Sequence, residues 1–586
     1  MVEQRASSPA RIGNCSGFYG DRLSAMREML ERGHLDYLTG DYLAELTMLI
    51  LGKDQLKDSS LGYARTYVAQ VAGCLGLALD GGVKLVSNAG GLNPAGLAAK
   101  LTEVAAGLGL DVKIAYVDGD NLAPRATDLG LGSALTANAY LGAFGIARAL
   151  AEGADIVVTG RVTDASVVVG PAIAHHGWTP TSYDELAGAV VAGHIIECGT
   201  QATGGNFSGF LDLPRDAQPL GFPLAEVAAD GSFVVTKHAG TGGLVSVDTI
   251  TAQLVYEVQS TLYLGPDVTT DLASIRLSQA GADRVEVSGV KGTPPPEKLK
   301  VCVNELGGWR NQMEFVLTGL DIEAKAAWLR TQLDARLAGN RPASVDWTLG
   351  AQPPRDAETE EGASCLLRVT VKDPSAEAVG KPFTAAAVEL ALASYPGFTM
   401  TAPPGRGSPY GIYRPAYVDR REATETVHLW DGTTIAIDAP VAATTIPPAT
   451  DAEPDPISPI APAQDAPAAA HPLGTFVHAR SGDKGGDANV GLWVGVPGPE
   501  VDDDKRERRI GWLLRLVTPD AIRTLLPEAA DLPVEVYPLP NLGGVNVLIR
   551  GLLGDGVAAS TRFDPQAKAV GEWLRSRYVH IPEELL

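Results

Sequence analysis

Between Arg11 and about Gly193, short apolar runs alternate with longer helical patterns, and this alternation limits the fold more than any other feature. The helical patterns, for example Pro94–Leu108 and Leu135–Glu152, are long enough for right-handed crossovers between parallel strands. The sequence therefore predicts that residues 1–194 form an α/β region with a mainly parallel sheet. Its expected strands are Ala10–Asn14, Leu35–Thr39, Val83–Ser87, Val112–Val117 and Asp155–Thr159.

The remaining residues show three further patterns, as expected for a chain of 586 residues, which is too long for one hydrophobic core. Residues 195–439 contain shorter, β-rich runs, including the expected strand Thr249–Val258, and predict an α+β region packed on the first. Residues 440–473 are rich in proline, alanine and acidic residues, which predicts a linker. Residues 474–586 combine strand-like and helical patterns, as in a small α+β domain.

Charge and cysteine content exclude several classes of function. The formal net charge of −23 disfavours nucleic acid as a partner, although a local basic spot still permits an anionic ligand such as coenzyme A. The five cysteines show no paired C-x-x-C spacing, which argues against a zinc site or a disulfide framework. No secretory leader or membrane span is recognisable, so we expect a cytoplasmic protein without membrane contact.

Polar residues follow the carboxyl ends of the predicted strands, where ligands bind in parallel α/β sheets. This places candidate substrate-binding side chains in successive loops, although each can equally serve as a helix N-cap. The residues are Asn14, Asp21, Asp41, Asn88, Asn93 and Arg161. Arg161 can clamp a carboxylate or phosphate, and Asp164 beside it can accept a proton. The alternative is an Arg–Asp pair that ties two loops together.

The segment from Gly193 to Phe207 concentrates the most chemistry. His194 is a candidate base, Glu197 a candidate carboxylate catalyst and Cys198 a candidate nucleophile. A lone cysteine is more often a small buried hydrophobe, which makes Cys198 the weakest of the three. The turn that follows can hold an oxyanion or a phosphate through its backbone N–H groups. Its residues are Gly204, Gly205 and Asn206.

Two more glycine-rich segments are candidate ligand sites. Lys237, Gly242 and Gly243 belong to a turn that can bind an anion, but it lacks the features of a P-loop or a dinucleotide fingerprint and can be a simple turn between strands. The segment from His478 to Asn489 carries more functional side chains than a turn requires. We predict proton-transfer roles for His478, Asp483 and Lys484, and binding roles for Arg480, Ser481 and Asn489.

No metal site is predicted, because the nine histidines are scattered and form no H-x-x-x-H or H-x-H pattern. No cofactor is predicted either. Coenzyme A is expected only as part of the substrate.

Several of these segments resemble the acyclic terpene utilisation (AtuA) family, named for bacterial degradation of acyclic terpenes such as citronellol and geraniol. The resemblance implies a long N-terminal region joined to a smaller C-terminal domain of ferredoxin-like fold. The similar segments, which span the chain from its start to its C-terminal domain, are Ile12–Arg22, Thr39–Glu45, Asn88–Pro94, Gly160–Ser166, Gly193–Phe207 and His478–Asn489.

The family's association with branched acyl-CoA catabolism leaves two main hypotheses open. The first is an enzyme, of the lyase or hydratase type, that performs acid/base chemistry on an acyl-CoA thioester. The second is a non-catalytic accessory or scaffold subunit of a biotin-dependent acyl-CoA carboxylase system. In either case we expect a homo-oligomer. A metal-dependent hydrolase is less favoured on the histidine pattern.

Overall fold

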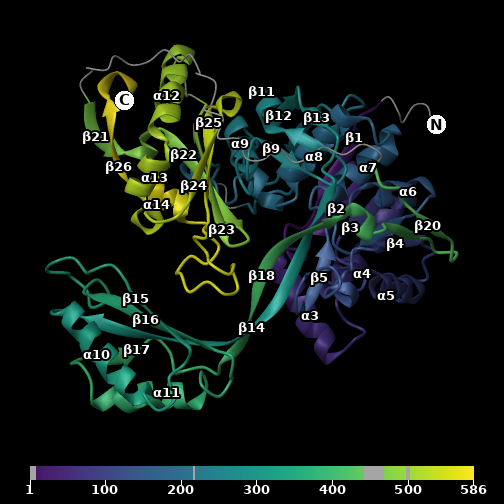
Figure 1. Ribbon diagram of the computed structural model, residues 1–586. Helices are drawn as coiled ribbons and strands as arrows, with labels where there is room; N and C mark the ends of the chain where they lie inside the picture. The colour runs from purple at the N-terminus through teal and green to yellow at the C-terminus, as the bar shows by residue number, and fades with distance from the viewer. Residues whose placement is uncertain (1–7, 216–217, 441–467, 497–501) are drawn as a thin grey trace. The chain divides into compact units, whose positions relative to one another are not determined.

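The computed structural model describes residues 8–215, 218–440, 468–496 and 502–586 (Figure 1). Its contacts divide the chain into two compact units. The first contains the residues up to Asn304 together with Arg414–Gly554 and Gln566–Leu586, and the second contains Glu305–Tyr413 and Asp555–Pro565. The predicted linker, residues 440–473, lies mostly outside the described residues. The structure describes only residue 440 and residues 468–473 of it, and Ala468–Pro472 form strand β21.

An eleven-stranded sheet forms the centre of the first unit. Its five middle strands pair in parallel, in the order β1 (Ala10–Asn14), β2 (Tyr37–Gly40), β3 (Lys84–Ser87), β6 (Ile156–Thr159) and β4 (Ile114–Asp118). These are the five strands predicted from the apolar runs. Their short β-α connections explain why they pair in parallel.

Antiparallel strands extend this sheet on both sides, so the prediction of a mainly parallel sheet is wrong. Next to β1 come β7 (Pro223–Val227), β8 (Phe233–Lys237), β12 (Arg284–Ser288) and β11 (Arg276–Gly281). Next to β4 come β19 (Thr426–His428) and β20 (Thr434–Ala436). These strands all belong to residues 195–439, the predicted α+β region. Part of that region therefore continues the sheet as antiparallel hairpins.

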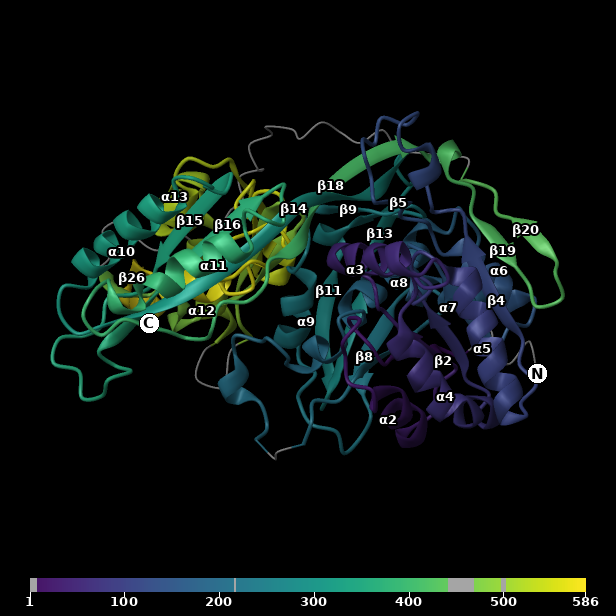
Figure 2. The ribbon, with the colours of Figure 1, turned by 90° about the horizontal axis from the view of Figure 1, so that it is seen from below.

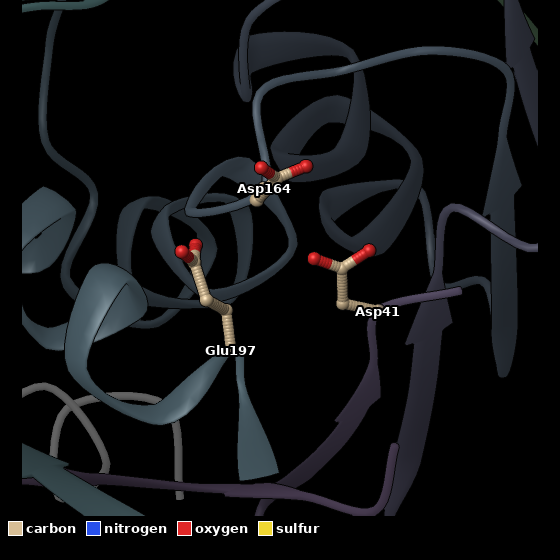
Figure 3. Close-up of side chains that lie close together, drawn as sticks. All are labelled: Asp41, Asp164 and Glu197. Atoms are coloured by element: carbon tan, nitrogen blue, oxygen red, sulfur yellow. The ribbon is translucent and has the colours of Figure 1, made fainter. Parts of the chain in front are cut away.

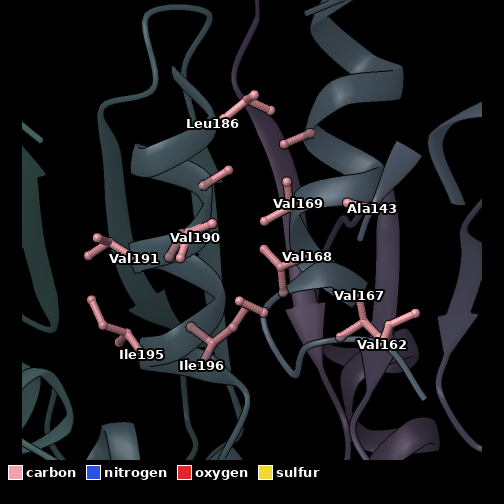
Figure 4. Packing of buried hydrophobic residues seen from close by; sticks show 14 of the residues in the cluster. Ala143, Val162, Val167, Val168, Val169, Leu186, Val190, Val191, Ile195 and Ile196 are labelled. Atoms are coloured by element: carbon pink, nitrogen blue, oxygen red, sulfur yellow. The ribbon is translucent and has the colours of Figure 1, made fainter. Parts of the chain in front are cut away.

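Helices cover both faces of the parallel strands, because successive side chains along each strand point to opposite faces. Leu85, Ile156 and Val158 pack with α2 (Ala25–Arg32), α4 (Arg65–Asp80) and α5 (Pro94–Leu108), and Figure 2 shows α4 and α5 side by side. Val86 and Val157 pack with α6 (Phe144–Ala151), α7 (Ser166–His176) and α8 (Tyr183–Ile196). Figure 4 shows the interlocking valines, leucine and isoleucines of α7 and α8.

Helix α8 is buried along almost its whole length, and its last turn leads directly into the candidate segment that begins at His194. Gly193 permits this approach, since a Cβ at that position would lie 2.7 Å from the Cα of Ala165. A larger residue would therefore push the end of α8 away from the loop that carries Asp164.

Two local predictions are wrong. Leu135–Glu152 is not one helix, because Thr136–Ala139 form strand β5, which pairs with β14 (Lys298–Thr318) before α6 begins. Thr249–Val258 is not a strand. Val247–Leu254 form helix α9, which begins with a capping box between Ser246 and Thr249.

Three smaller structural groups complete the chain. Within the first unit, β9 (Leu262–Leu264), β10 (Thr269–Asp271) and β13 (Lys291–Thr293) form a separate sheet, and α3 (Glu45–Lys57) follows β2. In the second unit, the helices α10 (Ile322–Leu337) and α11 (Lys381–Val388) pack on a sheet around Phe315, Leu333 and Leu367. Its strands are β15 (Ser344–Leu349), β16 (Ser364–Asp373) and β17 (Thr399–Met400), together with the parts of β14 and of β18 (Ser408–Asp419) that lie within Glu305–Tyr413.

The C-terminal part of the first unit is a four-stranded antiparallel sheet with helices, as predicted for a small α+β domain. Its strands, in order, are β22 (Val477–Lys484), β23 (Asp487–Val494), β25 (Gly544–Ile549) and β24 (Val534–Leu539). Strand β21 pairs with β26 (Tyr578–Pro582), and the helices are α12 (Asp503–Leu516), α13 (Pro519–Leu525) and α14 (Val570–Arg575).

The segment His478–Asn489 is therefore a β-hairpin and not a short glycine-hinged loop after a strand, as its glycines predict. Only Gly485 and Gly486 form the turn, and Gly485 has a positive φ of 68°. Buried amides connect this domain to the N-terminal part of the unit. Asn489 accepts the N–H of Glu257 at 2.7 Å, and Asn546 donates to the carbonyl of Val258 at 3.1 Å.

Candidate active site

The loops after the parallel strands meet at the carboxyl edge of the sheet, as the sequence predicts. Asn14, after β1, donates to the backbone carbonyl of Glu197 at 3.1 Å. Asn88, after β3, donates to the carboxylate of Asp41, after β2, at 2.6 Å. Asp120, after β4, accepts the backbone N–H of Arg161, after β6, at 2.9 Å. These hydrogen bonds connect the loops that carry the candidate residues.

Three carboxyl groups come together at this edge. Asp41, Asp164 and Glu197 each offer an oxygen, and the three oxygens lie within 4.8 Å of one another (Figure 3). Asp41 and Glu197 are buried, whereas Asp164 is partly exposed. Burial raises the pKa of Glu197 well above its usual range, and the charge of Asp164 raises it further.

His194 lies beside this group, with Nδ1 3.3 Å from Oε1 of Glu197. Burial lowers the pKa of His194 and raises that of Glu197, so it favours the neutral form of both groups over an ion pair. The ring of Tyr263 packs against His194 with 5.2 Å between the ring centres.

Arg161 is the buried cation of the site. It donates to Asp164 at 2.7 Å and to the carbonyl of Leu43 at 3.2 Å, and its guanidinium lies over the ring of Tyr140 at 4.3 Å. The predicted Arg–Asp pair exists, although it lies within one loop, and both residues border a cavity. The role of Arg161 in clamping a carboxylate or phosphate stays a prediction.

The cavity has a volume of about 170 Å³ and is formed entirely by residues of the first unit. Its polar wall brings together residues from both ends of the chain, namely Glu45, Tyr140, Arg161, Asp164, Glu257, Lys300, Asp483 and Lys484. Its apolar wall includes Leu262, Tyr263, Leu264, Pro266, Pro296 and Leu299. Glu197, Asp41 and His194 are not part of the cavity lining and lie behind it.

One side of the cavity is a network of charged groups. Tyr140 donates to Glu45 at 3.2 Å, and Lys300 lies 3.8 Å from the same carboxylate and over the Tyr140 ring at 4.8 Å. Burial alone would raise the pKa of Glu45, but Lys300, Arg161 and Lys484 lower it to about 2. Glu45 is therefore ionised at neutral pH and holds the cations in place.

Glu257 enters the cavity from a strained backbone. Its φ of 57° is in the left-handed region, which is uncommon for a residue other than glycine. The side chain of Asn489 accepts the Glu257 N–H and helps to hold this conformation. Backbone strain of this kind concentrates at functional sites, so Glu257 joins the candidate residues.

Comparison with known proteins identifies the family. The profile described as acyclic terpene utilisation family protein AtuA matches residues 10–429, and the profile described as AtuA ferredoxin-like domain matches residues 471–580. The chain belongs to the AtuA family. The C-terminal α+β domain is accordingly the AtuA ferredoxin-like domain. Neither a curated protein nor a solved structure matches the chain. Among the described residues, no helix has the length and apolar character needed to cross a membrane.

The AtuA ferredoxin-like domain contributes Asp483 and Lys484 to the cavity. Burial raises the pKa of Asp483 to about 8, with further contributions from the charges of Glu257 and Glu45. At neutral pH this carboxyl group therefore carries a proton.

The raised pKa of Asp483 predicts a pH-dependent stability. The folded protein holds this proton up to about pH 8, whereas the unfolded chain releases it near pH 4. The contribution of Asp483 to the free energy of unfolding is thus fully present below about pH 4 and is lost as the pH rises to about 8. Asp483→Asn should flatten this part of the stability curve, which urea unfolding at several pH values measures. Parallel curves for the two proteins would contradict the assignment.

The surroundings of Cys198 argue against a role as nucleophile in this AtuA-family protein. Although part of its surface is exposed, burial of the thiol raises its pKa strongly, and Glu257 and Glu197 raise it further. We expect iodoacetamide to label Cys198 in the folded protein at pH 7.5 at least about tenfold more slowly than in the unfolded chain, since the thiolate is the reactive form. Mass spectrometry of digests measures both rates, and equal rates would contradict the expectation.

Other predicted residues have structural contacts away from the cavity. His478 is packed between Phe207 and Trp493 and binds Ser208 at 3.0 Å. Arg480 contacts Gln201 and lies over Tyr256, while Ser481 donates to the carbonyl of Lys568 at 3.1 Å. The cavity lining also excludes Asn14, Asp21, Asn88, Asn93, Gly204, Gly205, Asn206 and Asn489.

The anion site predicted at Lys237, Gly242 and Gly243 is not part of the cavity. Lys237 pairs with Asp283 at 3.1 Å and donates to the carbonyl of Thr241, which closes its own turn. Gly242 and Gly243 approach the backbone of Gln218 and Thr203 and are not in the cavity lining. Asp21 accepts the N–H of Gly17, and Asn93 caps α5 by accepting the N–H of Gly96.

Proposed function

We propose that this AtuA-family protein is an enzyme that binds a carboxylated, branched acyl thioester in the cavity and performs lyase or hydratase-type acid/base chemistry on it. The observation that carries the proposal is the composition of the cavity wall. It combines the cations Arg161, Lys300 and Lys484 with a carboxyl group, Asp483, whose pKa of about 8 is close to neutral pH.

The cations support the choice of a substrate with a carboxylate. Arg161 presents a guanidinium that binds carboxylates through two N–H groups, and Lys300 and Lys484 add positive charge to the same wall. The leucine, proline and tyrosine side chains that also line the cavity suit an apolar branched chain. A volume of about 170 Å³ suits the acyl part of the substrate and leaves coenzyme A outside.

Asp483 supports the choice of acid/base chemistry. A general acid or base works best when its pKa is near the working pH, because both protonation states are then accessible. Asp483 meets this condition, and Glu257 lies on the same wall as a second carboxyl group. Protonated Asp483 would supply the proton that a hydroxyl leaving group or an enolate carbon requires. Lys484 would stabilise the negative charge that develops on the thioester oxygen.

The experiment is a turnover screen of the purified full-length protein. Branched acyl-CoA thioesters are supplied in pairs that differ only in a second carboxylate, and the products are followed by mass spectrometry. The proposal predicts conversion of the carboxylated member of a pair. No conversion of any member, together with co-purification of biotin-containing subunits from a native extract, would replace it with the accessory-subunit role.

A further inference from the structure

The three carboxyl groups at the edge of the cavity, of which Asp164 alone lines it, have no role in the chemistry proposed for Asp483. We propose that Asp41, Asp164 and Glu197 form a binding site for a hard divalent cation, Mg²⁺ or Mn²⁺. The inference goes beyond the proposed function, because that function requires no metal. It also departs from the sequence analysis, which considered only histidine and cysteine patterns and predicted no metal.

The positions of the oxygens suit such a cation after small side-chain movements. One oxygen from each residue lies within 4.8 Å of the other two, and Figure 3 shows the three side chains close together. An octahedral Mg²⁺ has oxygens at about 2.0–2.1 Å, which places neighbouring ligands about 3 Å apart. Mg²⁺ usually keeps several waters, so three carboxylates are a sufficient protein contribution.

Buried atoms without hydrogen bonds give independent support for a ligand here. Within the described residues, Oε2 of Glu197 has no hydrogen-bond partner, and the residue is 3% exposed. His194, 4% exposed, has no well-aligned hydrogen bond at either ring nitrogen, although the backbone of Gln253 and Tyr256 is near, and its Nδ1 lies 3.3 Å from Glu197. Buried polar atoms of native proteins nearly always have a partner, and a bound cation would supply one.

The local charge matches a divalent ion. When a cation displaces the protons that burial favours on Asp41 and Glu197, three ionised carboxylates and the guanidinium of Arg161 sum to −3 + 1 = −2, which one divalent cation neutralises. Arg161 binds Oδ1 of Asp164 at 2.7 Å, so the second oxygen of that carboxylate remains for the cation. Carboxylate oxygens select hard cations such as Mg²⁺ and Mn²⁺ over softer metals.

Hydrogen bonds already orient two of the three ligands. The Oδ1 atom of Asp41 accepts the side-chain N–H of Asn88 at 2.6 Å and the backbone N–H of Leu43 at 3.0 Å. Asn14 holds the backbone carbonyl of Glu197 at 3.1 Å. Supporting contacts of this kind fix the first ligands of metal sites and make them rigid. The role of Asn14 and Asn88 in this account is therefore positional.

The test is Mn²⁺ binding to the full-length protein, measured by electron paramagnetic resonance of free Mn²⁺. We expect one saturable site per chain, from which Mg²⁺ displaces Mn²⁺. Asp41→Asn and Glu197→Gln should each weaken binding at least about tenfold, whereas Asp503→Asn, in an exposed acidic stretch, should leave it unchanged. No saturable binding, or equal binding by all four proteins, would overturn the proposal.

A second measurement needs no variant. Anomalous scattering from a wild-type crystal soaked in Mn²⁺ should give a peak between the three carboxyl groups, and a peak only elsewhere would overturn the proposal. The result is separable from the proposed function, because the turnover screen depends on Asp483 and is expected to respond to Asp483→Asn whether or not Mn²⁺ binds.

Discussion

Asp483→Asn is expected to lower kcat on a carboxylated acyl-CoA by about 10²–10⁴-fold, the usual contribution of a positioned general acid or base. Asparagine has nearly the same shape and keeps hydrogen-bonding groups, but it cannot transfer a proton. The hairpin β22–β23 should therefore keep its position, and KM should change much less than kcat. Stopped or continuous assays on the converted substrate from the turnover screen measure both constants.

The matched control is Asp503→Asn, which makes the same chemical change at an exposed position of the same domain. Its kcat should equal that of the wild type. The pH profile adds a separate readout: if protonated Asp483 donates the proton, the rate of the wild type falls above about pH 8. A loss of less than about tenfold in Asp483→Asn would show that another group transfers the proton.

Arg161→Met is expected to lower the free energy of unfolding by about 3–5 kcal/mol, the effect of removing one partner from a buried ion pair. The side chain of Arg161 is 3% exposed, and its removal leaves Asp164 without its cation next to two more carboxyl groups. Methionine fills a similar volume, so lost charge and hydrogen bonds dominate the effect. The midpoint of urea unfolding, followed by tryptophan fluorescence, measures it.

Two further variants separate charge from geometry. Arg161→Lys keeps the charge but lacks the forked donors that reach Asp164 and the carbonyl of Leu43, so it should lie between the wild type and Arg161→Met. Arg125→Met removes an exposed ion pair with Glu422 and should change the free energy of unfolding by less than about 1 kcal/mol. Equal effects of Arg125→Met and Arg161→Met would contradict a special role for Arg161.

The sequence predicts the centre of the fold because local patterns determine it. The runs that end at Ser87 and Thr159 are rich in valine, leucine and isoleucine, and the helices between the strands leave parallel pairing as the natural arrangement. The convergence of Asn14, Asp41, Asn88 and Arg161 at one edge follows from that arrangement. The antiparallel extension was missed because β7, β8 and β12 come from a later segment, and no local pattern specifies which edge they join.

Much of the cavity wall depends on contacts that a single sequence does not reveal. Tyr140 and Lys300 come together because β5 pairs with β14, which follows it by more than 150 residues. Glu257 was missed because a left-handed conformation has no signature in a residue other than glycine. Asp483 and Lys484 were predicted for their chemistry, but the hairpin that presents them was not, since its glycines resemble those of a loop.

The central claim is that the AtuA ferredoxin-like domain and the N-terminal part of the chain build one substrate cavity. A crystal structure with a carboxylated acyl-CoA bound tests this directly. The account predicts the acyl carboxylate within hydrogen-bond distance of Arg161 or Lys300 and the reacting carbon within reach of Asp483. An acyl group bound outside this cavity, with Asp483 and Lys484 remote from it, would contradict the account.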